Sequence, residues 1–190
     1  AEDLAADGCP QQLVDLAVKT FGRLDAVVNN AAFVAKGDLH STDATFFMKM
    51  IEVNALAPFL LIKAALPHLR TTHGCALNIG SVNAWCGEPN LFPYSVSKGA
   101  LMTLTRNLGD TLMREDGVRV NQINPGWVLT ERQKEHWVTP EGLAAHLARQ
   151  CLPDPIQPED VAGTVLFLAS EASKMMTSQT LILDGGFISS

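Results

Sequence analysis

Short apolar runs alternate with longer segments of helical periodicity along the whole chain. Residues 24–32 (LDAVVNNAA), 75–82 (CALNIGSV), 118–126 (VRVNQINPG) and 180–186 (TLILDGG) are short and rich in apolar or β-branched residues. Their apolar residues are mostly contiguous rather than alternating, and this pattern is typical of strands covered on both faces. The alternation predicts an α/β fold built on a doubly wound, Rossmann-like parallel sheet.

The segments between the runs read as helices with recognisable ends. Residues 41–70 predict a long helix, with Ser41 or Thr42 as its N-cap. Pro58 and Pro67 predict kinks or ends within that segment. The other helices are expected at residues 10–22, at residues 94–116 before Gly117, and at residues 158–170, where Pro158 suits the first turn.

Length and charge narrow the classes of function. The 190 residues are 47% hydrophobic, which predicts a single domain over residues 1–190. A net charge of −6 argues against a nucleic-acid partner or an anionic membrane surface. The longest apolar stretch, ALAPFLLIKAALPHL, is interrupted by Lys63 and two prolines, and we expect no membrane span there.

The cysteines and histidines show no metal-binding spacing. The four cysteines are far apart, without a C-x-x-C pair, which predicts reduced thiols in a cytoplasmic protein (Cys9, Cys75, Cys86 and Cys151). His136 and His146 are separated by ten residues in polar surroundings, so we expect solvated side chains and no metal site.

One expected part of a nucleotide-binding sheet is missing from the sequence. Such sheets normally open with a strand, a glycine-rich turn and a helix whose N-terminus receives the pyrophosphate. No G-x-G-x-x-G or related glycine cluster precedes a helix here. We therefore expect an N-terminally truncated domain that lacks the first strands.

The stretch PYSVSK places Tyr94 and Lys98 four residues apart. On a helix these residues share a face, with Cβ atoms roughly 6 Å apart. An ammonium beside a phenol lowers the phenol's pKa from about 10, which suits proton transfer to a carbonyl or from an alcohol. Ser81, at the end of a predicted strand, is a candidate to hold the same substrate oxygen. The competing interpretation is an ordinary exposed pair of helix residues.

Short motifs rich in asparagine, glycine, serine and tyrosine follow one another along the chain. They are VVNNAA at 27–32, VNALAPF at 53–59, IGSV at 79–82, YSVSK at 94–98, NPGWVLT at 124–130 and LDGG at 183–186. In this order and spacing they resemble the short-chain dehydrogenase/reductase family from about Asp3 to the end. The resemblance implies strands four to seven of that family's sheet, and an oxidoreductase that uses NAD or NADP, with NAD slightly preferred.

The family resemblance implies a role for each of four catalytic candidates. Tyr94 would be the general acid/base, and Lys98 would lower its pKa and bind the nicotinamide ribose. Ser81 would orient the substrate oxygen, and Asn54 would hold a water in a proton relay to the lysine. The plainer interpretation of Asn54 is a solvated amide in the middle of a helix.

The resemblance also implies a set of cofactor-binding residues, which Tyr94 and Lys98 would join. They are Asp3, Leu4, Asn30, Ala31, Ala32, Pro125, Gly126, Val128 and Thr130. Ala32 stands where the family motif ends in glycine. Simple turn formation is the alternative for the asparagine pair and for the Pro-Gly step.

Residues 127–157, which we call the lid, correspond to the family's variable substrate segment. Their content is similar to that of bacterial sugar (aldose) dehydrogenases, and this implies a sugar or polyol as substrate. The predicted substrate-binding residues are Ser81, Asn83, Tyr94, Trp127, Arg132 and Gln133, with Trp137 and Gln150 as further polar or aromatic groups. The alternative is an amphipathic lid whose polar residues face water.

Two further expectations concern activity and assembly. Without a glycine-rich turn, we expect negligible turnover from the isolated 190-residue chain. A truncated, inactive binding or regulatory module is therefore the competing function, although such a module has no need of Asn54, Ser81, Tyr94 and Lys98 together. The resemblance implies a homodimer or homotetramer.

Overall fold

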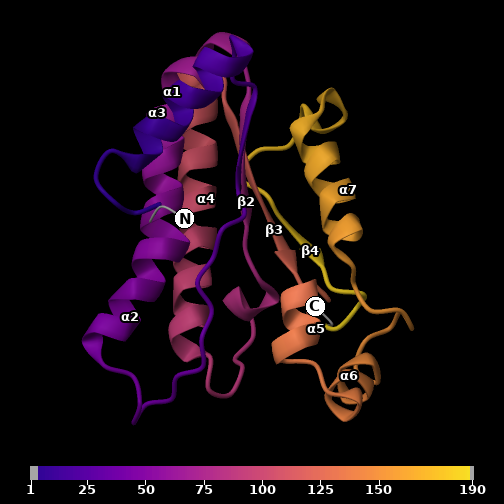
Figure 1. The fold of residues 1–190 in the computed structure, drawn as a ribbon. Coiled ribbons are helices and arrows are strands. Elements are labelled where there is room, and N and C mark those ends of the chain that lie inside the picture. The colour runs from indigo at the N-terminus through magenta and orange to yellow at the C-terminus, as the bar shows by residue number, and fades with distance from the viewer. Residues whose placement is uncertain (1–3, 189–190) are drawn as a thin grey trace.

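A computed structural model describes residues 4–188 of the chain. Within them, a parallel sheet forms in the order β1 (Ala26–Asn29), β2 (Cys75–Ile79), β3 (Arg119–Pro125) and β4 (Thr180–Leu183) (Figure 1). All neighbouring strands run parallel, in registers such as Asn29 opposite Asn78. This arrangement confirms the predicted α/β class and the parallel sheet.

Helices cover both faces of the sheet. On one side lie α1 (Cys9–Phe21), α3 (Ala57–Thr72) and α4 (Phe92–Asp116), and on the other lies α7 (Pro158–Ala169) (Figure 1). Two shorter helices, α5 (Glu131–His136) and α6 (Pro140–Leu147), form part of the lid. Two short 3₁₀ helices are η2 (Val82–Ala84) and η3 (Glu171–Ser173).

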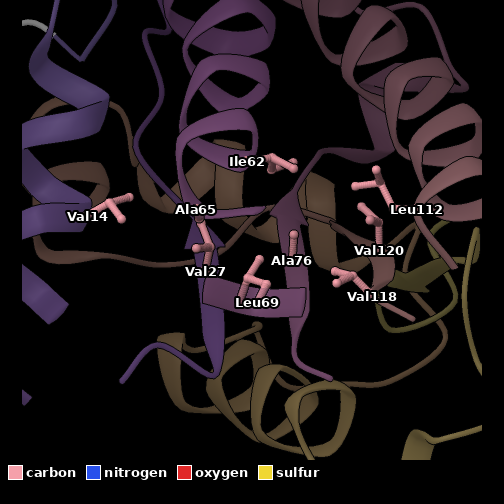
Figure 2. Close-up of a cluster of buried hydrophobic side chains, with 9 residues drawn as sticks. All are labelled: Val14, Val27, Ile62, Ala65, Leu69, Ala76, Leu112, Val118 and Val120. Atoms are coloured by element: carbon pink, nitrogen blue, oxygen red, sulfur yellow. The ribbon is translucent and has the colours of Figure 1, made fainter. Parts of the chain in front are cut away.

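Each face of the sheet has its own hydrophobic core. The cluster in Figure 2 lies between the sheet and α1, α3 and α4, and it consists of Val14, Val27, Ile62, Ala65, Leu69, Ala76, Leu112, Val118 and Val120. On the opposite face, Cys75, Leu77 and Ile123 pack against Leu168 of α7. Successive residues of β2 thus enter opposite cores, as strand geometry requires. This double burial explains the contiguous apolar runs of the sequence.

The long helical segment begins and bends differently from the sequence expectation. Its first part, α2 (Ala44–Ile51), is capped by Asp43, whose carboxylate accepts a hydrogen bond from Phe46 N at 2.8 Å. The prediction of Ser41 or Thr42 as N-cap is therefore wrong. A π-helical turn, η1 (Glu52–Leu56), joins α2 to α3 directly before Pro58. Pro67 lies inside α3 and does not end it.

The continuous helical stretch Ala44–Thr72 is long and apolar enough, by length and composition, to cross a membrane. One face of the stretch packs in the fold: Ile62, Ala65 and Leu69 belong to the core between α3 and the sheet. The stretch also contains the buried polar Asn54. Its other face is exposed, since 33% of the apolar window is buried.

The ends of α4 and α7 agree with the sequence. Gly117 follows α4 in the left-handed conformation, with φ of 68°, as expected of a helix C-cap. Pro158 occupies the first turn of α7, where Gln157 and Asp160 form a reciprocal capping box.

Candidate active site

The candidate catalytic residues meet where β2 ends and α4 begins. Ser81 follows the last residues of β2, and Tyr94 and Lys98 lie on the first two turns of α4. Carboxyl ends of parallel strands are the usual location of ligand sites in such sheets. Tyr94 and Ser81 are half-buried, whereas Lys98 is only 2% exposed.

Lys98 is fixed by a single backbone contact. Its Nζ donates a hydrogen bond to the carbonyl oxygen of Ile79 at 2.7 Å, and it lies 5.7 Å from the centroid of the Tyr94 ring. Burial disfavours the charged ammonium and lowers the pKa of Lys98 to about 8. The helical spacing therefore brings the phenol and the ammonium together, as the sequence predicted.

The pKa of Tyr94 differs from the sequence expectation. Burial raises this pKa above its ordinary value of 10.0, and a hydrogen bond with the Ser81 side chain opposes the rise. The predicted lowering by Lys98 is not found, because burial of the phenol is the largest influence on its pKa. Tyr94 is thus a protonated acid at neutral pH in this structure.

Ser81 is held through its backbone and its hydroxyl. Its N–H donates to Oδ1 of Asn124 at 3.1 Å, and its Oγ accepts from the backbone N–H of Asn83 at 3.1 Å, where Ser81 caps η2. The Ser81 side chain also acts on the Tyr94 phenol, whose pKa it lowers against the effect of burial. Two hydroxyl groups at this position are able to bind one substrate oxygen.

Asn54 is completely buried in the π-helical turn and is not the solvated amide of the plainer interpretation. Its Oδ1 accepts from Phe33 N, and its Nδ2 donates to Phe33 O and to Ser97 Oγ, all within 2.9 Å. The Ser97 hydroxyl in turn donates to the carbonyl of Tyr94 at 2.7 Å. Asn54 therefore joins the loop after β1 to the first turn of α4. Its water-holding role stays a prediction.

Three predicted cofactor-binding residues lie around one hollow beside β1. A cavity of about 50 Å³ is lined by Leu4, Asn30 and Ala31, together with residues of α1 and α3. Ala32 follows directly in the loop. The predicted contact at Asp3 lies outside the described residues.

The other predicted cofactor-binding residues lie at the end of β3 and just beyond it. Pro125 ends β3, and Gly126 N donates to Leu183 O at 2.9 Å. Val128 pairs with Ile156 in an isolated bridge, and Thr130 uses its hydroxyl to cap α5 by accepting from Gln133 N. The turn is thereby fixed at the same edge of the sheet as Ser81.

Two of the predicted substrate-binding residues in the lid bind each other. Trp127 Nε1 donates to Oε1 of Gln133 at 2.9 Å, and the Trp127 ring contacts His146 edge-on at 5.3 Å between centroids. Arg132 is exposed on α5. Lys36, in the loop after β1, lies 5.2 Å from the ring centroid of Trp137 and so links the lid to the main body.

A larger hollow of about 470 Å³ adjoins the lid and was not predicted. Cys86, Glu88, Arg149 and Phe187 line it, with Gly87, Pro89 and Ile188. The Phe187 ring stacks on His146, at 4.5 Å between centroids, and the Arg149 guanidinium lies 4.2 Å from its centroid. No sequence motif marks these residues, because they come from three separate segments that only the fold brings together.

Comparison with known proteins identifies the family. A family model described as enoyl-(acyl carrier protein) reductase matches residues 2–188. The chain belongs to the short-chain dehydrogenase/reductase family. The chain is 36% identical over 173 residues to a probable galactose dehydrogenase, GalD, of Rhizobium meliloti (strain 1021). The match covers 90% of this chain and 67% of that one.

A second curated relative and two solved structures extend the comparison. L-fucose dehydrogenase of Mus musculus is 38% identical over 181 residues, covering 93% of this chain and 66% of that one. The chain thus spans about two thirds of the length of these curated relatives. A gluconate 5-dehydrogenase from Burkholderia cenocepacia J2315, in complex with NADP and tartrate, superposes with a TM-score of 0.89 at 27% identity, over 98% of this chain and 73% of that one. A 7α-hydroxysteroid dehydrogenase in complex with NADH superposes with a TM-score of 0.91 at 31% identity. The match covers 97% of this chain and 71% of that one.

The family settles the general class of chemistry and of cofactor. The chain has the sequence and fold of a nicotinamide-dependent oxidoreductase, and its structural neighbours contain either NADP or NADH. The preference for NAD stays a prediction, because the two neighbours differ in their cofactor.

Sequence reasoning missed a set of buried amides beneath Ser81. Asn78, Gln122 and Asn124 are fully buried within β2 and β3. The signal was present, since amide side chains in strands that are buried on both faces need polar partners. Their partners lie on other elements and are not visible in the sequence.

Proposed function

We propose that this protein transfers a hydride between nicotinamide and the carbinol or carbonyl carbon of a sugar or polyol. The observation that supports this most strongly is the convergence of Ser81, Tyr94 and Lys98. The Ser81 hydroxyl lies near enough to the Tyr94 phenol to oppose the rise of its pKa, and Lys98 Nζ lies 5.7 Å from the Tyr94 ring centroid. The predicted cofactor-binding residues Leu4, Asn30 and Ala31 lie around one hollow beside β1, which supports a cofactor site there.

Tyr94 would act as the proton-transfer group. Its raised pKa keeps the phenol protonated at neutral pH, so it is ready to donate to a carbonyl oxygen. In the oxidative direction the phenol would first release its proton to solvent, and the phenolate oxygen would then receive the proton of the carbinol. The bound nicotinamide supplies the hydride acceptor or donor.

Ser81 and Lys98 would support Tyr94 in different ways. The Ser81 hydroxyl would donate a second hydrogen bond to the substrate oxygen. The position of Ser81 is set by its contacts with Asn83 and Asn124. Lys98 stays close to the phenol because Ile79 O anchors its ammonium. A pKa of about 8 leaves Lys98 mostly protonated at neutral pH, so it can bind the ribose hydroxyls as a cation.

A sugar or polyol is the substrate class that the relatives support. The probable galactose dehydrogenase, the L-fucose dehydrogenase and the gluconate 5-dehydrogenase all act, by name, on polyhydroxylated molecules. Asn83 and Arg132 offer hydrogen-bond groups of the kind that sugar hydroxyls need. An inactive binding module is disfavoured, because it has no need of the buried, polar Lys98 beside Tyr94.

The proposal is tested by single-turnover oxidation of a reduced dinucleotide. The protein is used in excess over NADH or NADPH, because the sequence expectation is slow turnover. Nicotinamide absorbance is followed with keto sugars and sugar lactones, then in reverse with L-fucose, D-galactose and gluconate. We expect conversion with at least one sugar and a loss of about 10²–10⁴-fold in Tyr94→Phe. No conversion of any sugar by folded protein that binds the reduced dinucleotide would contradict the proposed substrate class.

Assembly and location are also proposals. We propose a homodimer or homotetramer, because Met48, Phe92 and Val96 form exposed apolar surface on α2 and α4. Light scattering of the purified protein would measure the mass, and a monomer at micromolar concentration would contradict this. We propose a cytoplasmic location, because Cys75, Cys86 and Cys151 form no disulfide within residues 4–188.

A further inference from the structure

A continuous chain of buried polar side chains crosses the sheet and ends at Ser81. The chain begins at the end of β1, passes through β2, the middle of α4 and β3, and reaches the turn after β2. Its members are Asn29, Asn78, Thr105, Gln122, Asn124 and Ser81. The four residues between the ends are completely shielded from solvent.

The first half of the chain connects the asparagine turn to α4. Asn29 Nδ2 donates to Asn78 Oδ1 at 2.8 Å, and Asn78 Nδ2 donates to Thr105 Oγ1 at 2.8 Å. The Thr105 hydroxyl lies 2.9 Å from the Leu101 carbonyl oxygen and 2.9 Å from Oε1 of Gln122, and its one hydrogen serves one of these acceptors at a time. The orientation of the Gln122 amide, with its nitrogen toward Asn124, follows from the Asn124 oxygen, which also accepts from the Ser81 N–H.

The second half of the chain fixes Asn124. Gln122 Nε2 donates to Asn124 Oδ1 at 2.7 Å, and Ser81 N donates to the same oxygen at 3.1 Å. Two donors on one oxygen set the orientation of the Asn124 amide. Its Nδ2 is left buried without a hydrogen-bond partner within residues 4–188. A buried donor without a partner is unfavourable for folding, whereas the two hydrogen bonds to Oδ1 favour it.

The turn that bears Ser81 lies directly against this amide pair. A Cβ added at Gly80 would fall on Oδ1 of Asn124 and Nε2 of Gln122. Glycine at this position therefore lets the backbone approach β3 closely enough for the Ser81 N–H to reach Asn124. From that anchored backbone, the Ser81 side chain caps η2 and contacts Tyr94.

We propose that Asn124, oriented by Gln122, is a positioning residue that holds the Ser81 backbone so that the Ser81 hydroxyl faces Tyr94. This inference rests on the proposed function only in assigning Ser81 and Tyr94 to the substrate oxygen. Asn124 touches neither the phenol nor the reacting atoms in this account, and it acts through Ser81. The other residues of the hydrogen-bonded series, from Asn29 to Gln122, set which atom of the Asn124 amide faces the Ser81 N–H.

Tyr94 gives a direct readout that does not need turnover, because it is the only tyrosine in the sequence. Alkaline titration of phenolate absorbance measures its pKa in the folded protein. In Asn124→Leu we expect this pKa to rise by about one unit, because Ser81 no longer supports the phenolate. Ser81→Ala should give the same rise, and the double variant should rise no further than Ser81→Ala.

Asn121 offers a matched control on the same strand. It is equally buried and carries the same side chain, but it donates to Met176 O at 2.8 Å and accepts from Gln179 N at 3.0 Å. Asn121→Leu should lower stability without moving the Tyr94 titration. An unshifted pKa in folded Asn124→Leu, or an equal shift in Asn121→Leu, would overturn the proposal.

A measurement on the unaltered protein covers the case in which Asn124→Leu fails to fold. Hydrogen exchange of the Ser81 amide should be slow, as for the strand residues, because its N–H is bonded to a shielded oxygen. Exchange of the Ser81 amide at the rate of an exposed loop would contradict the anchoring role. Absence of sugar oxidation would leave both measurements intact, so failure of the proposed function and failure of this inference are distinguishable.

Discussion

Lys98 Nζ and the carbonyl oxygen of Ile79 are 2.7 Å apart, so the ammonium on α4 is fastened to the last residue of β2. The contact places a nearly inaccessible cation beside the phenol of Tyr94. Burying a charge is unfavourable unless its environment compensates. The lowered pKa of Lys98 shows that one carbonyl compensates only in part.

This burial predicts a pH-dependent effect of Lys98→Met on stability. The pKa is about 8 in the folded chain against an ordinary 10.5, so the unfolded state binds more protons between these values. Wild-type stability relative to Lys98→Met should therefore increase by about 3 kcal/mol as pH rises through this window. Urea unfolding of both proteins at several pH values measures the difference.

Lys63 provides the control for this experiment. It is exposed on α3, so Lys63→Met removes a charge that folding does not bury. Its stability difference from wild type should stay constant over the same pH range. A flat profile for Lys98→Met as well would show that the ammonium is not held in a desolvated site.

The N-cap of α2 at Asp43 predicts a second effect on the free energy of unfolding. Its carboxylate caps α2 through Phe46 N, so Asp43→Ala should lower the free energy of unfolding by about 1 kcal/mol. Thr42→Val is the matched control, because the Thr42 hydroxyl is buried without a hydrogen-bond partner among the described residues. That substitution should be neutral or stabilising. Equal losses from both would place the cap where the sequence suggested it.

Two glycines of α4 should respond in opposite directions to alanine. At Gly99 a Cβ meets nothing within 4 Å, so Gly99→Ala should stabilise the helix by about 1 kcal/mol. At Gly109 a Cβ would lie 2.6 Å from the backbone nitrogen of Ser178, and that contact outweighs the gain in helix propensity. Gly109→Ala should lower stability by about 1–2 kcal/mol. Thermal unfolding of both variants gives the signs, and stabilisation by Gly109→Ala would contradict the close packing of α4 on the turn before β4.

The sequence predicted those features that depend on local spacing. Continuous apolar runs located the strands, and the four-residue separation of Tyr94 and Lys98 fixed their common helix face. Ser41 was mistaken for a cap because its hydroxyl and N–H bind Asp38 in the preceding turn. A preference for serine at helix starts does not reveal which neighbouring group has already bound it.

Features that depend on tertiary packing were not predictable in the same way. The pKa of Tyr94 rises because elements distant in sequence shield the phenol, whereas only its charged neighbour is visible in the motif. Asn54 was expected in a regular helix, and the π-helical turn that buries it is set by packing against α4. The polar chain from Asn29 to Ser81 likewise joins residues up to 49 positions apart.

The most direct test of the account is the rate of nicotinamide-coupled sugar conversion in wild type and Tyr94→Phe, measured under single-turnover conditions. Removing one hydroxyl leaves the ring, its packing and the neighbouring Lys98 in place. The account predicts a loss of about 10²–10⁴-fold in rate with unchanged stability near neutral pH. A Tyr94→Phe protein that converts the sugar at the wild-type rate would show that Tyr94 does not transfer the proton.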